Sequence, residues 1–202
     1  LPNRILLHEY LKLSLQRAIK YKTQAALLVI DLDHFKIVNE SLGHAKGDEL
    51  LRQIVARIQQ TADPQDSLSR FGGDEFAMVC DSCNDSIQAA NMAEKILALF
   101  RRPFCIDGQD IFMTASIGIC LYPTVGRSAE EVFRYAETAL SKAKDSERGS
   151  YTFYDSILTK AAARKLYIAN ELRTAIDENQ LEVHYQPVYS LNDQRIIGCE
   201  AL

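Results

Sequence analysis

The chain has 202 residues, of which 47% are hydrophobic and 25% charged, with a formal net charge of −4. This composition predicts one complete globular domain with an appendage. Charges of both signs are interspersed, so the basic surface expected of a protein that grips a nucleic-acid polymer is missing. No apolar run approaches the roughly 18 residues of a transmembrane helix. Because Met and a leader are missing at the start, we expect a cytoplasmic fragment whose parent protein can be membrane-anchored.

Five scattered cysteines suit a reducing compartment better than a disulfide framework. Cys80-x-x-Cys83 is half of a zinc or redox pattern, but no second pair or nearby His completes it. We interpret this pair as thiols at the end of a strand.

The N-terminal third predicts a helix, a buried strand and a second helix. Apolar residues repeat every four positions from Arg4 to Lys20, as in a helix. The apolar run Ala25 to Ile30 ends in Asp31-Leu32-Asp33, which predicts a buried strand with carboxylates at its C-terminal end. A helix with one apolar face is expected from about Lys46 to Gln60.

A β-hairpin with an acidic tip is predicted next. The strand-like runs Leu68 to Phe71 and Phe76 to Cys80 flank Gly72-Gly73-Asp74-Glu75, a tight turn whose glycines can take positive φ. A helix is expected from about Ser86 to Arg101.

A second hairpin is predicted from Phe104 to Ile106 and Ile111 to Ile119, the latter with a period-two apolar stripe. Ser128 and Glu131 form a capping box at the start of a further helix. Tyr151 to Tyr154 is the expected closing strand. Because helices and hairpins are mixed and no Gly-rich phosphate loop follows the first strand, we expect an α+β fold rather than a doubly wound sheet.

The organisation changes near residue 155. A long amphipathic helix is predicted from Leu158 to Ile176, followed by a strand from Leu181 to Tyr185. The last stretch of roughly 45 residues is too short to form a second core by itself.

Four carboxylates gather at the two strand-to-turn sites, from Asp31, Asp33, Asp74 and Glu75. Hard oxygen donors of this kind suit Mg²⁺, which takes the rest of its shell from water and phosphates. The alternative is a pair of solvated turns, where Asp and Gly are favoured anyway.

Two long motifs in order resemble the signature of the GGDEF family. They are the segment Asp31 to Asp48 and, starting 24 residues after Asp48, Gly72-Gly73-Asp74-Glu75-Phe76. The opening Leu1-Pro2-Asn3-Arg4 is similar to the family's start, and Ala143-Lys144 with Arg148 falls where the family keeps its C-terminal phosphate-binding pair. The resemblance covers residues 1 to about 155.

This resemblance implies a palm-like fold of the kind found in nucleotidyl cyclases and polymerases. A central, mostly antiparallel sheet is then flanked by helices and followed by a C-terminal helix-strand extension. The implied activity is that of a diguanylate cyclase, which binds GTP with Mg²⁺ or Mn²⁺. A homodimer would condense two GTP into cyclic di-GMP and pyrophosphate.

The resemblance also implies roles for individual residues. Asp31, the carbonyl of Leu32, Asp74 and Glu75 would hold the metal. Asp74 would also accept the 3′-hydroxyl proton, with Glu75 and Lys36 completing the catalytic set. The implied substrate-binding residues are Phe35, Asn39, His44, Asp48, Gly72, Gly73, Lys144 and Arg148.

The chemistry of the substrate residues fits these roles. Asn39 and Asp48 have the donors and acceptors to read guanine, and adenine would leave them mispaired, so GTP is expected over ATP. Lys144 and Arg148 would neutralise phosphates, although each read singly is a surface cation. Gly72 and Gly73 would let the backbone approach the nucleotide.

Three positions depart from the family pattern. Asp63-Pro64-Gln65-Asp66 stands where many active members carry an Arg-x-x-Asp product-inhibition site, so no feedback binding of cyclic di-GMP is expected there unless Arg57 or Arg70 reaches it. Glu147-Arg148-Gly149 replaces Gly-Arg-Asn, and the acid would weaken nucleotide affinity. Glu40 replaces the usual Asp.

The tail resembles the start of an EAL domain, the phosphodiesterase that linearises cyclic di-GMP. His184-Tyr185-Gln186-Pro187 and Glu200-Ala201-Leu202 carry this resemblance, and Glu200 would be a metal ligand in the complete barrel. The expected domains are 1–155 (GGDEF), 156–180 (linker helix) and 181–202 (truncated start of EAL). An ordinary helix-strand extension is the alternative.

Two functions therefore remain open. The first is an active diguanylate cyclase, and the second is a GTP-binding module that regulates an adjoining EAL phosphodiesterase. A purely structural dimerisation domain is disfavoured because it has no use for the acidic residues.

Overall fold

The computed structural model describes residues 1–154, 171–172, 174–176, 178, 180, 182–190 and 195–201. The chain divides into two compact units, Leu1–Thr159 and Lys160–Leu202, which are described separately. Within the described residues, no helix combines the length and apolar character that crossing a membrane requires.

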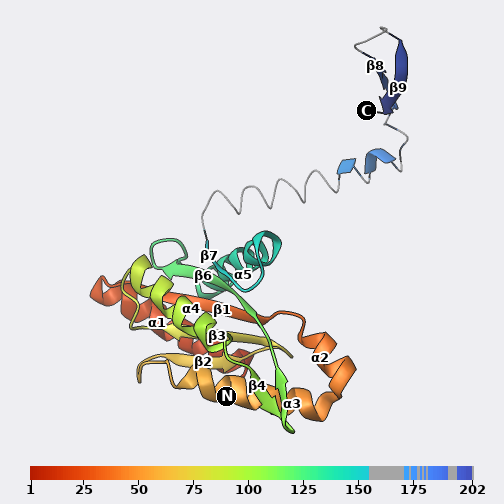
Figure 1. Ribbon diagram of the computed structural model, residues 1–202. Coiled ribbons are helices and arrows are strands. Elements are labelled where there is room, and N and C mark those ends of the chain that lie inside the picture. Colours follow the sequence, from red (N-terminus) through yellow and green to blue (C-terminus); the bar gives the residue numbers. More distant parts are fainter. Residues whose placement is uncertain are drawn as a thin grey trace. The chain divides into compact units, whose positions relative to one another are not determined.

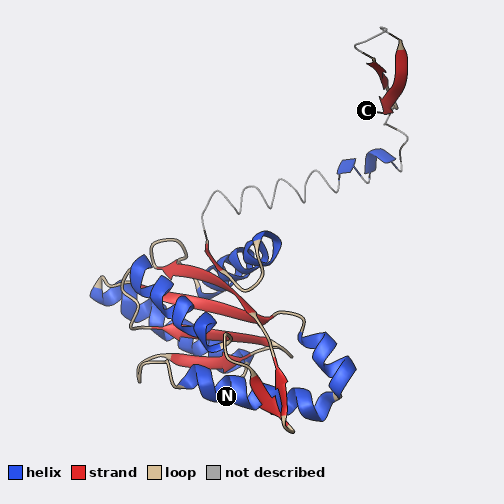
Figure 2. Ribbon diagram, viewed as in Figure 1, coloured by secondary structure: helices blue, strands red, loops and turns tan. Residues whose placement is uncertain are grey.

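A five-stranded sheet forms the centre of the first unit (Figures 1 and 2). Its strands, in spatial order, are β2 (Ser67–Arg70), β3 (Glu75–Cys80), β1 (Ala25–Leu32), β6 (Ala115–Tyr122) and β7 (Tyr151–Phe153). Neighbouring strands run antiparallel except β6 and β7, which are parallel. The predicted α+β class with a mostly antiparallel sheet is confirmed.

Helices cover both faces of this sheet, as Figure 2 shows. The helices α1 (Arg4–Tyr21) and α5 (Ala129–Ser146) pack on one face, and α3 (His44–Gln59) and α4 (Ser86–Leu99) on the other. The short helix α2 (Phe35–Leu42) packs against α3. In β1, Leu28 and Ile30 pack in the core formed with α3 and α4, whereas Leu27 and Val29 pack in the core formed with α1 and α5. Burial on both faces explains why this strand is a continuous apolar run.

The predicted second hairpin is only partly correct. Strand β4 (Phe104–Ile106) pairs with a short strand, β5 (Gln109–Ile111), and β6 begins only at Ala115. The apolar stripe from Ile111 to Ile119 nevertheless faces the core under α3 and α4, with Ile111 partly buried. One continuous pattern of alternating apolar residues therefore extends over β5 and β6, which belong to different sheets.

Two other helix predictions need adjustment. Helix α2 was not predicted, because only Phe35 among its residues is buried. The predicted capping box of α5 is half confirmed: Ser128 Oγ accepts from the Glu131 N–H at 3.2 Å. The Glu131 carboxylate instead accepts from the Arg127 N–H, at 3.0 Å.

In the second unit, β8 (Tyr185–Tyr189) and β9 (Ile196–Ala201) form an antiparallel hairpin. The strand predicted from Leu181 to Tyr185 is wrong except at Tyr185, because residues 182–184 are not in a strand and β8 runs from Tyr185 to Tyr189. Leu181 itself and most of the helix predicted from Leu158 to Ile176 lie outside the described residues; 171–172 and 174–176 are helical.

Gly118 marks the point where α5 crosses β6. A Cβ at this position would lie 2.1 Å from the Ala136 oxygen and 2.3 Å from the Leu140 nitrogen. Backbone atoms of a packed helix do not move aside cheaply, so we expect Gly118→Ala to lower the free energy of unfolding by about 1–3 kcal/mol. Urea denaturation measures this effect.

Gly73→Ala is the matched control, because no heavy atom lies within 4 Å of its added Cβ and its φ is not positive. Equal stability losses in the two variants would contradict the proposed close approach of α5 to β6.

Candidate functional site

The pairing of β1 with β3 sets two acidic residues opposite each other. Asp31 is the cross-strand partner of Glu75, and opposite residues on one face of a sheet have Cβ atoms about 4.5–5.5 Å apart. The Leu32 N–H donates to the Asp74 oxygen at 3.2 Å, which extends the ladder into the turn. The four residues predicted to bind the metal therefore lie together, at the end of β1 and in the adjoining hairpin turn.

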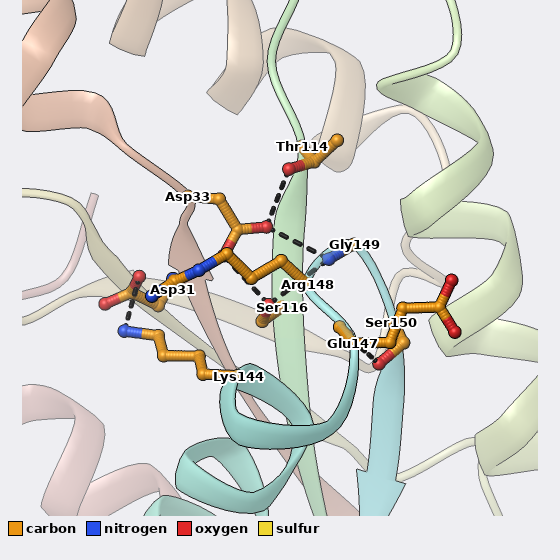
Figure 3. Close-up of polar contacts among 9 residues, drawn as sticks. All are labelled: Asp31, Asp33, Thr114, Ser116, Lys144, Glu147, Arg148, Gly149 and Ser150. Atoms are coloured by element: carbon orange, nitrogen blue, oxygen red, sulfur yellow. Dashed lines mark hydrogen bonds and ion pairs between the residues drawn. The ribbon is translucent and has the colours of Figure 1, made fainter.

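Asp31 is mostly buried and forms an ion pair with Lys144. The Lys144 Nζ lies 2.7 Å from Asp31 Oδ1, as Figure 3 shows. Burial raises the pKa of Asp31, and the ammonium of Lys144 opposes this shift. Burial also raises the pKa of Glu75, helped by the negative charges of Asp31 and Asp74. This crowding of carboxylates favours a bound cation.

Asp33 has a different role from the other three carboxylates. Its side chain is fully buried and accepts hydrogen bonds from Thr114 Oγ1 at 2.7 Å, Ser116 Oγ at 2.9 Å and the Gly149 N–H at 3.1 Å (Figure 3). The Arg148 guanidinium lies 3.4 Å from Asp33 Oδ1. Asp33 thus ties the end of β1 to β6 and to the turn after α5.

The hairpin turn depends on Gly72. A Cβ on Gly72 would lie 2.2 Å from Glu75 Oε2, so glycine is required for the Glu75 side chain to lie over the turn. The positive φ that glycines can take is not used in this turn, because neither Gly72 nor Gly73 has one. The N–H groups of Phe71 and Gly72 close the turn by donating to the Glu75 oxygen, at 3.1 Å and 3.4 Å.

Six predicted residues meet at a cleft of about 480 Å³. The cleft lies among α2, the start of α3 and the hairpin turn. Its lining residues are Phe35, Lys36, Asn39, Glu40, His44, Gly73 and Asp74. Lys36 also lies 3.6 Å from Glu40, and both side chains are exposed.

Gly47 is a site residue that sequence reasoning missed. A Cβ on Gly47 would lie 1.9 Å from Asn39 Oδ1 and 3.3 Å from Phe35 Cζ. The glycine therefore makes room for the Asn39 amide between α2 and α3. A glycine inside an otherwise regular helical pattern was the available signal.

The remaining predicted residues do not line this cleft. Asp48 lines a hollow of about 630 Å³ together with Arg70, and the Arg70 guanidinium contacts the carbonyl of Gly73 in the cleft. Lys144 and Arg148 are paired with Asp31 and Asp33.

The donor set at the end of β1 fits a hard divalent cation. No group of three His, Cys, Asp or Glu residues in the described part of the chain already surrounds one point. Asp31 already pairs with one positive charge, the ammonium of Lys144. Asp31, Glu75, Asp74 and the Leu32 carbonyl offer only oxygens, the ligands that Mg²⁺ prefers.

Residues 1–150 match the model of one protein family, described as "Diguanylate cyclase, GGDEF domain". The chain belongs to the GGDEF family. Its 202 residues are 38% identical to the bifunctional diguanylate cyclase/cyclic di-GMP phosphodiesterase MucR of Pseudomonas aeruginosa, covering 100% of this chain and 29% of MucR. The diguanylate cyclase TpbB of the same species is 36% identical over 151 residues, 74% of this chain and 35% of TpbB. The chain thus spans about a third or less of these two relatives.

Solved GGDEF structures share the fold. The GGDEF domain of TpbB from Pseudomonas aeruginosa superimposes with a TM-score of 0.78 at 33% identity, covering 81% of this chain and 95% of that chain. The coiled coil and GGDEF domain of DgcB from Caulobacter crescentus, in complex with cyclic di-GMP, gives a TM-score of 0.68 at 28% identity, covering 75% of this chain and 80% of that chain.

Many active GGDEF proteins carry a product-inhibition site at the position of residues 63–66. In this chain, residues near that position form hydrogen bonds within the domain. The Asp66 carboxylate accepts from the Ser82 N–H and Oγ, at 3.2 Å and 3.0 Å. Arg57 donates to three carbonyls at the end of α4 and just after it. Arg70 donates to carbonyls of the hairpin turn. Both alternative arginines thus have internal partners; the missing feedback site stays a prediction.

The two motifs that resemble an EAL domain lie on one hairpin in the second unit. Gln186 in β8 is the cross-strand partner of Glu200 in β9. The EAL assignment and the domain boundaries at 155 and 180 stay predictions.

Because Asp33 has more hydrogen-bond partners than Asp31, the same substitution at the two positions should lower stability by different amounts. In Asp33→Asn, an NH₂ group would replace one of the two carboxylate oxygens that accept these hydrogen bonds, and at least one buried donor would lose its acceptor. We therefore expect a loss of about 2–3 kcal/mol in the free energy of unfolding. Asp31→Asn should cost less than about 1 kcal/mol, because burial already disfavours the charged form of Asp31. Urea denaturation at pH 7 compares the two variants, and a larger loss for Asp31→Asn would contradict these roles.

Proposed function

We propose that the chain is the catalytic domain of a diguanylate cyclase, which binds GTP with Mg²⁺ and makes cyclic di-GMP as a homodimer. The observation that supports this proposal most strongly is that a cleft and a pair of acidic residues adjoin the same hairpin turn. The cleft is lined by α2 and Asp74, and the acidic pair is the cross-strand pair of Asp31 and Glu75 at the end of β1.

The cleft offers groups for the base and the phosphates of GTP. The Asn39 amide in the cleft and the Asp48 carboxylate in the adjoining hollow would read the guanine edge. Lys36 lines the same cleft and would bind a phosphate oxygen and stabilise negative charge as the reaction proceeds.

Asp31, Glu75, Asp74 and the Leu32 carbonyl would hold the metal. When bound, Mg²⁺ supplies positive charge that offsets the triphosphate. Asp74 would accept the proton of the 3′-hydroxyl as this oxygen attacks the α-phosphorus of the second GTP. A new P–O bond would form, the bond to the β-phosphate would break, and pyrophosphate would leave. The same attack by the 3′-hydroxyl of the second GTP on the α-phosphorus of the first would close the ring and release a second pyrophosphate. Because each domain holds one GTP, two domains must face each other.

A second candidate is a GTP-binding module that regulates an adjoining phosphodiesterase. Arg148 is engaged with buried Asp33 rather than free for a phosphate, and Glu147 adds a negative charge beside it. The chain is also 38% identical over 177 residues to a relative named only as a phosphodiesterase, NbdA of Pseudomonas aeruginosa.

Turnover distinguishes the two candidates. We expect the purified chain, dimerised through a fused leucine zipper, to convert GTP and Mg²⁺ into cyclic di-GMP, detected by chromatography. Asp74→Ala should lower the rate by about 100-fold or more, the usual contribution of a positioned base, with unchanged thermal stability.

Calorimetry with GTP and ATP completes this test. Selective binding of GTP without turnover in the zipper-linked form would favour the regulatory module. Equal affinities for GTP and ATP would contradict both candidates, because Asn39 and Asp48 would then not read the base.

Lys144 gives a separate prediction about the metal. Its ammonium lies on Asp31 Oδ1 and therefore competes with a metal ion for that carboxylate. We expect Lys144→Met to tighten the binding of Mn²⁺ alone by about fivefold, because a nearby positive charge is removed. The same change should weaken GTP binding, since a cation for the phosphates is lost.

Electron paramagnetic resonance of free Mn²⁺ measures the metal affinity. Lys142→Met is the control, because Lys142 lies on the same helix and is exposed, away from Asp31. Unchanged Mn²⁺ affinity in Lys144→Met would show that Asp31 is not the metal ligand.

A further inference from the structure

Arg70 holds the inner side of the hairpin turn. Its Nε lies 3.2 Å from the Gly72 oxygen and 3.2 Å from the Gly73 oxygen, and its Nη2 donates to the Gly73 oxygen at 2.7 Å. The Arg70 N–H donates to the Pro2 oxygen at 3.0 Å, which fixes the end of β2 from which the side chain extends. Two successive carbonyls therefore converge on one guanidinium.

The direction of these carbonyls fixes the direction of two N–H groups. In a trans peptide the C=O and the following N–H point in opposite directions, and the bonds after Gly72 and Gly73 are not cis. These two peptide planes carry the N–H groups of Gly73 and Asp74. Both N–H groups therefore point away from Arg70, toward the outer side of the turn.

The outer side of the turn is open. Among the described residues, no acceptor receives a hydrogen bond from the N–H of Gly73 or Asp74, whereas those of Phe71 and Gly72 bond to Glu75. No heavy atom lies within 4 Å of a Cβ built on Gly73. Gly73 and Asp74 line the 480 Å³ cleft together with Lys36.

We propose that Arg70 holds the turn as a ready-made anion site, in which the N–H groups of Gly73 and Asp74 bind a phosphate oxygen of the nucleotide. Successive backbone N–H groups in a turn form such anion-binding concavities. The inference rests on the proposed function, because the anion is the triphosphate of the GTP that the cleft would hold.

The backbone N–H groups of the turn would offset the repulsion between the acidic residues of the site and a bound phosphate. Asp74 and Glu75 place negative charge next to the position that a phosphate must occupy, and the pKa of Glu75 is already raised by burial and by its acidic neighbours. Backbone donors that are fixed before the substrate arrives offset this repulsion without a cost of reorganisation. Arg70 acts as a positioning residue and does not itself touch the substrate.

Nuclear magnetic resonance tests the proposal on the ¹⁵N-labelled chain. The probe is GTP with a methylene bridge between its α- and β-phosphates, added with Mg²⁺, and calorimetry measures its binding in parallel. We expect the amide protons of Gly73 and Asp74 to move downfield as they gain an acceptor. The amide of Gly108, between β4 and β5, serves as the internal control.

Arg70→Lys should remove these shifts and weaken binding by about five- to tenfold, because a lysine lacks the fork that engages two carbonyls. Arg102→Lys is the matched control, because Arg102 is exposed and lines neither the cleft nor the adjoining hollow, and it should change neither quantity. The titration of the unmodified chain shows whether the N–H groups of Gly73 and Asp74 bind a phosphate, even if Arg70→Lys fails to fold.

Two outcomes would overturn the proposal in distinguishable ways. If the analogue binds but the Gly73 and Asp74 protons do not move downfield, the anion site is wrong and the proposed function stands. If no guanine nucleotide binds at all, the proposed function fails and the anion site fails with it.

Discussion

The antiparallel register between β1 and β3 is the constraint on which the site depends. It places Asp31 opposite Glu75 and brings the Leu32 N–H to the carbonyl of Asp74. A slip of one residue would turn every side chain of β1 to the other face. Asp31 would then enter the core under α3 and α4, where Ile30 and Leu32 lie, so apolar burial on both faces of β1 also fixes the position of the carboxylates.

The second determinant is the close approach of α5 to β6 at Gly118. The last turn of α5 carries Lys144 to Asp31, and the turn that follows carries Arg148 and Gly149 to Asp33. Because the Asp33 side chain is fully buried and hydrogen-bonded, it fixes the local backbone, whereas Asp31 and Glu75 keep a pKa raised by incomplete compensation of their burial. One strand end thus carries a fully buried, hydrogen-bonded acid and, two residues before it, the acid that we propose binds the metal.

Local patterns in the sequence were sufficient for much of this arrangement. The apolar run before Asp31 and the glycines before Asp74 predicted the strand and the hairpin that the structure contains. Helix α2 escaped prediction because it buries only Phe35, so its apolar pattern is short. The break between β5 and β6 was also missed, because the alternation of apolar residues continues across it.

The contacts that distinguish the acidic residues could not be predicted from local patterns. Asp33 meets Thr114 and Gly149, which lie 81 and 116 positions away in the chain. The role of Arg70 depends on the direction of two carbonyls in the turn, which composition does not encode. Both features follow from packing between elements rather than from the spacing of residues.

The central claim is that the Asp31 and Glu75 pair forms the metal-binding half of a GTP site. A crystal structure with Mn²⁺ and a non-hydrolysable GTP analogue, read through the anomalous signal of the metal, tests it most directly. The account predicts Mn²⁺ within about 2.0–2.3 Å of carboxylate oxygens of Asp31 and Glu75, with Lys144 moved from Asp31 to a phosphate. Mn²⁺ bound elsewhere, with the Lys144 ion pair intact, would contradict it.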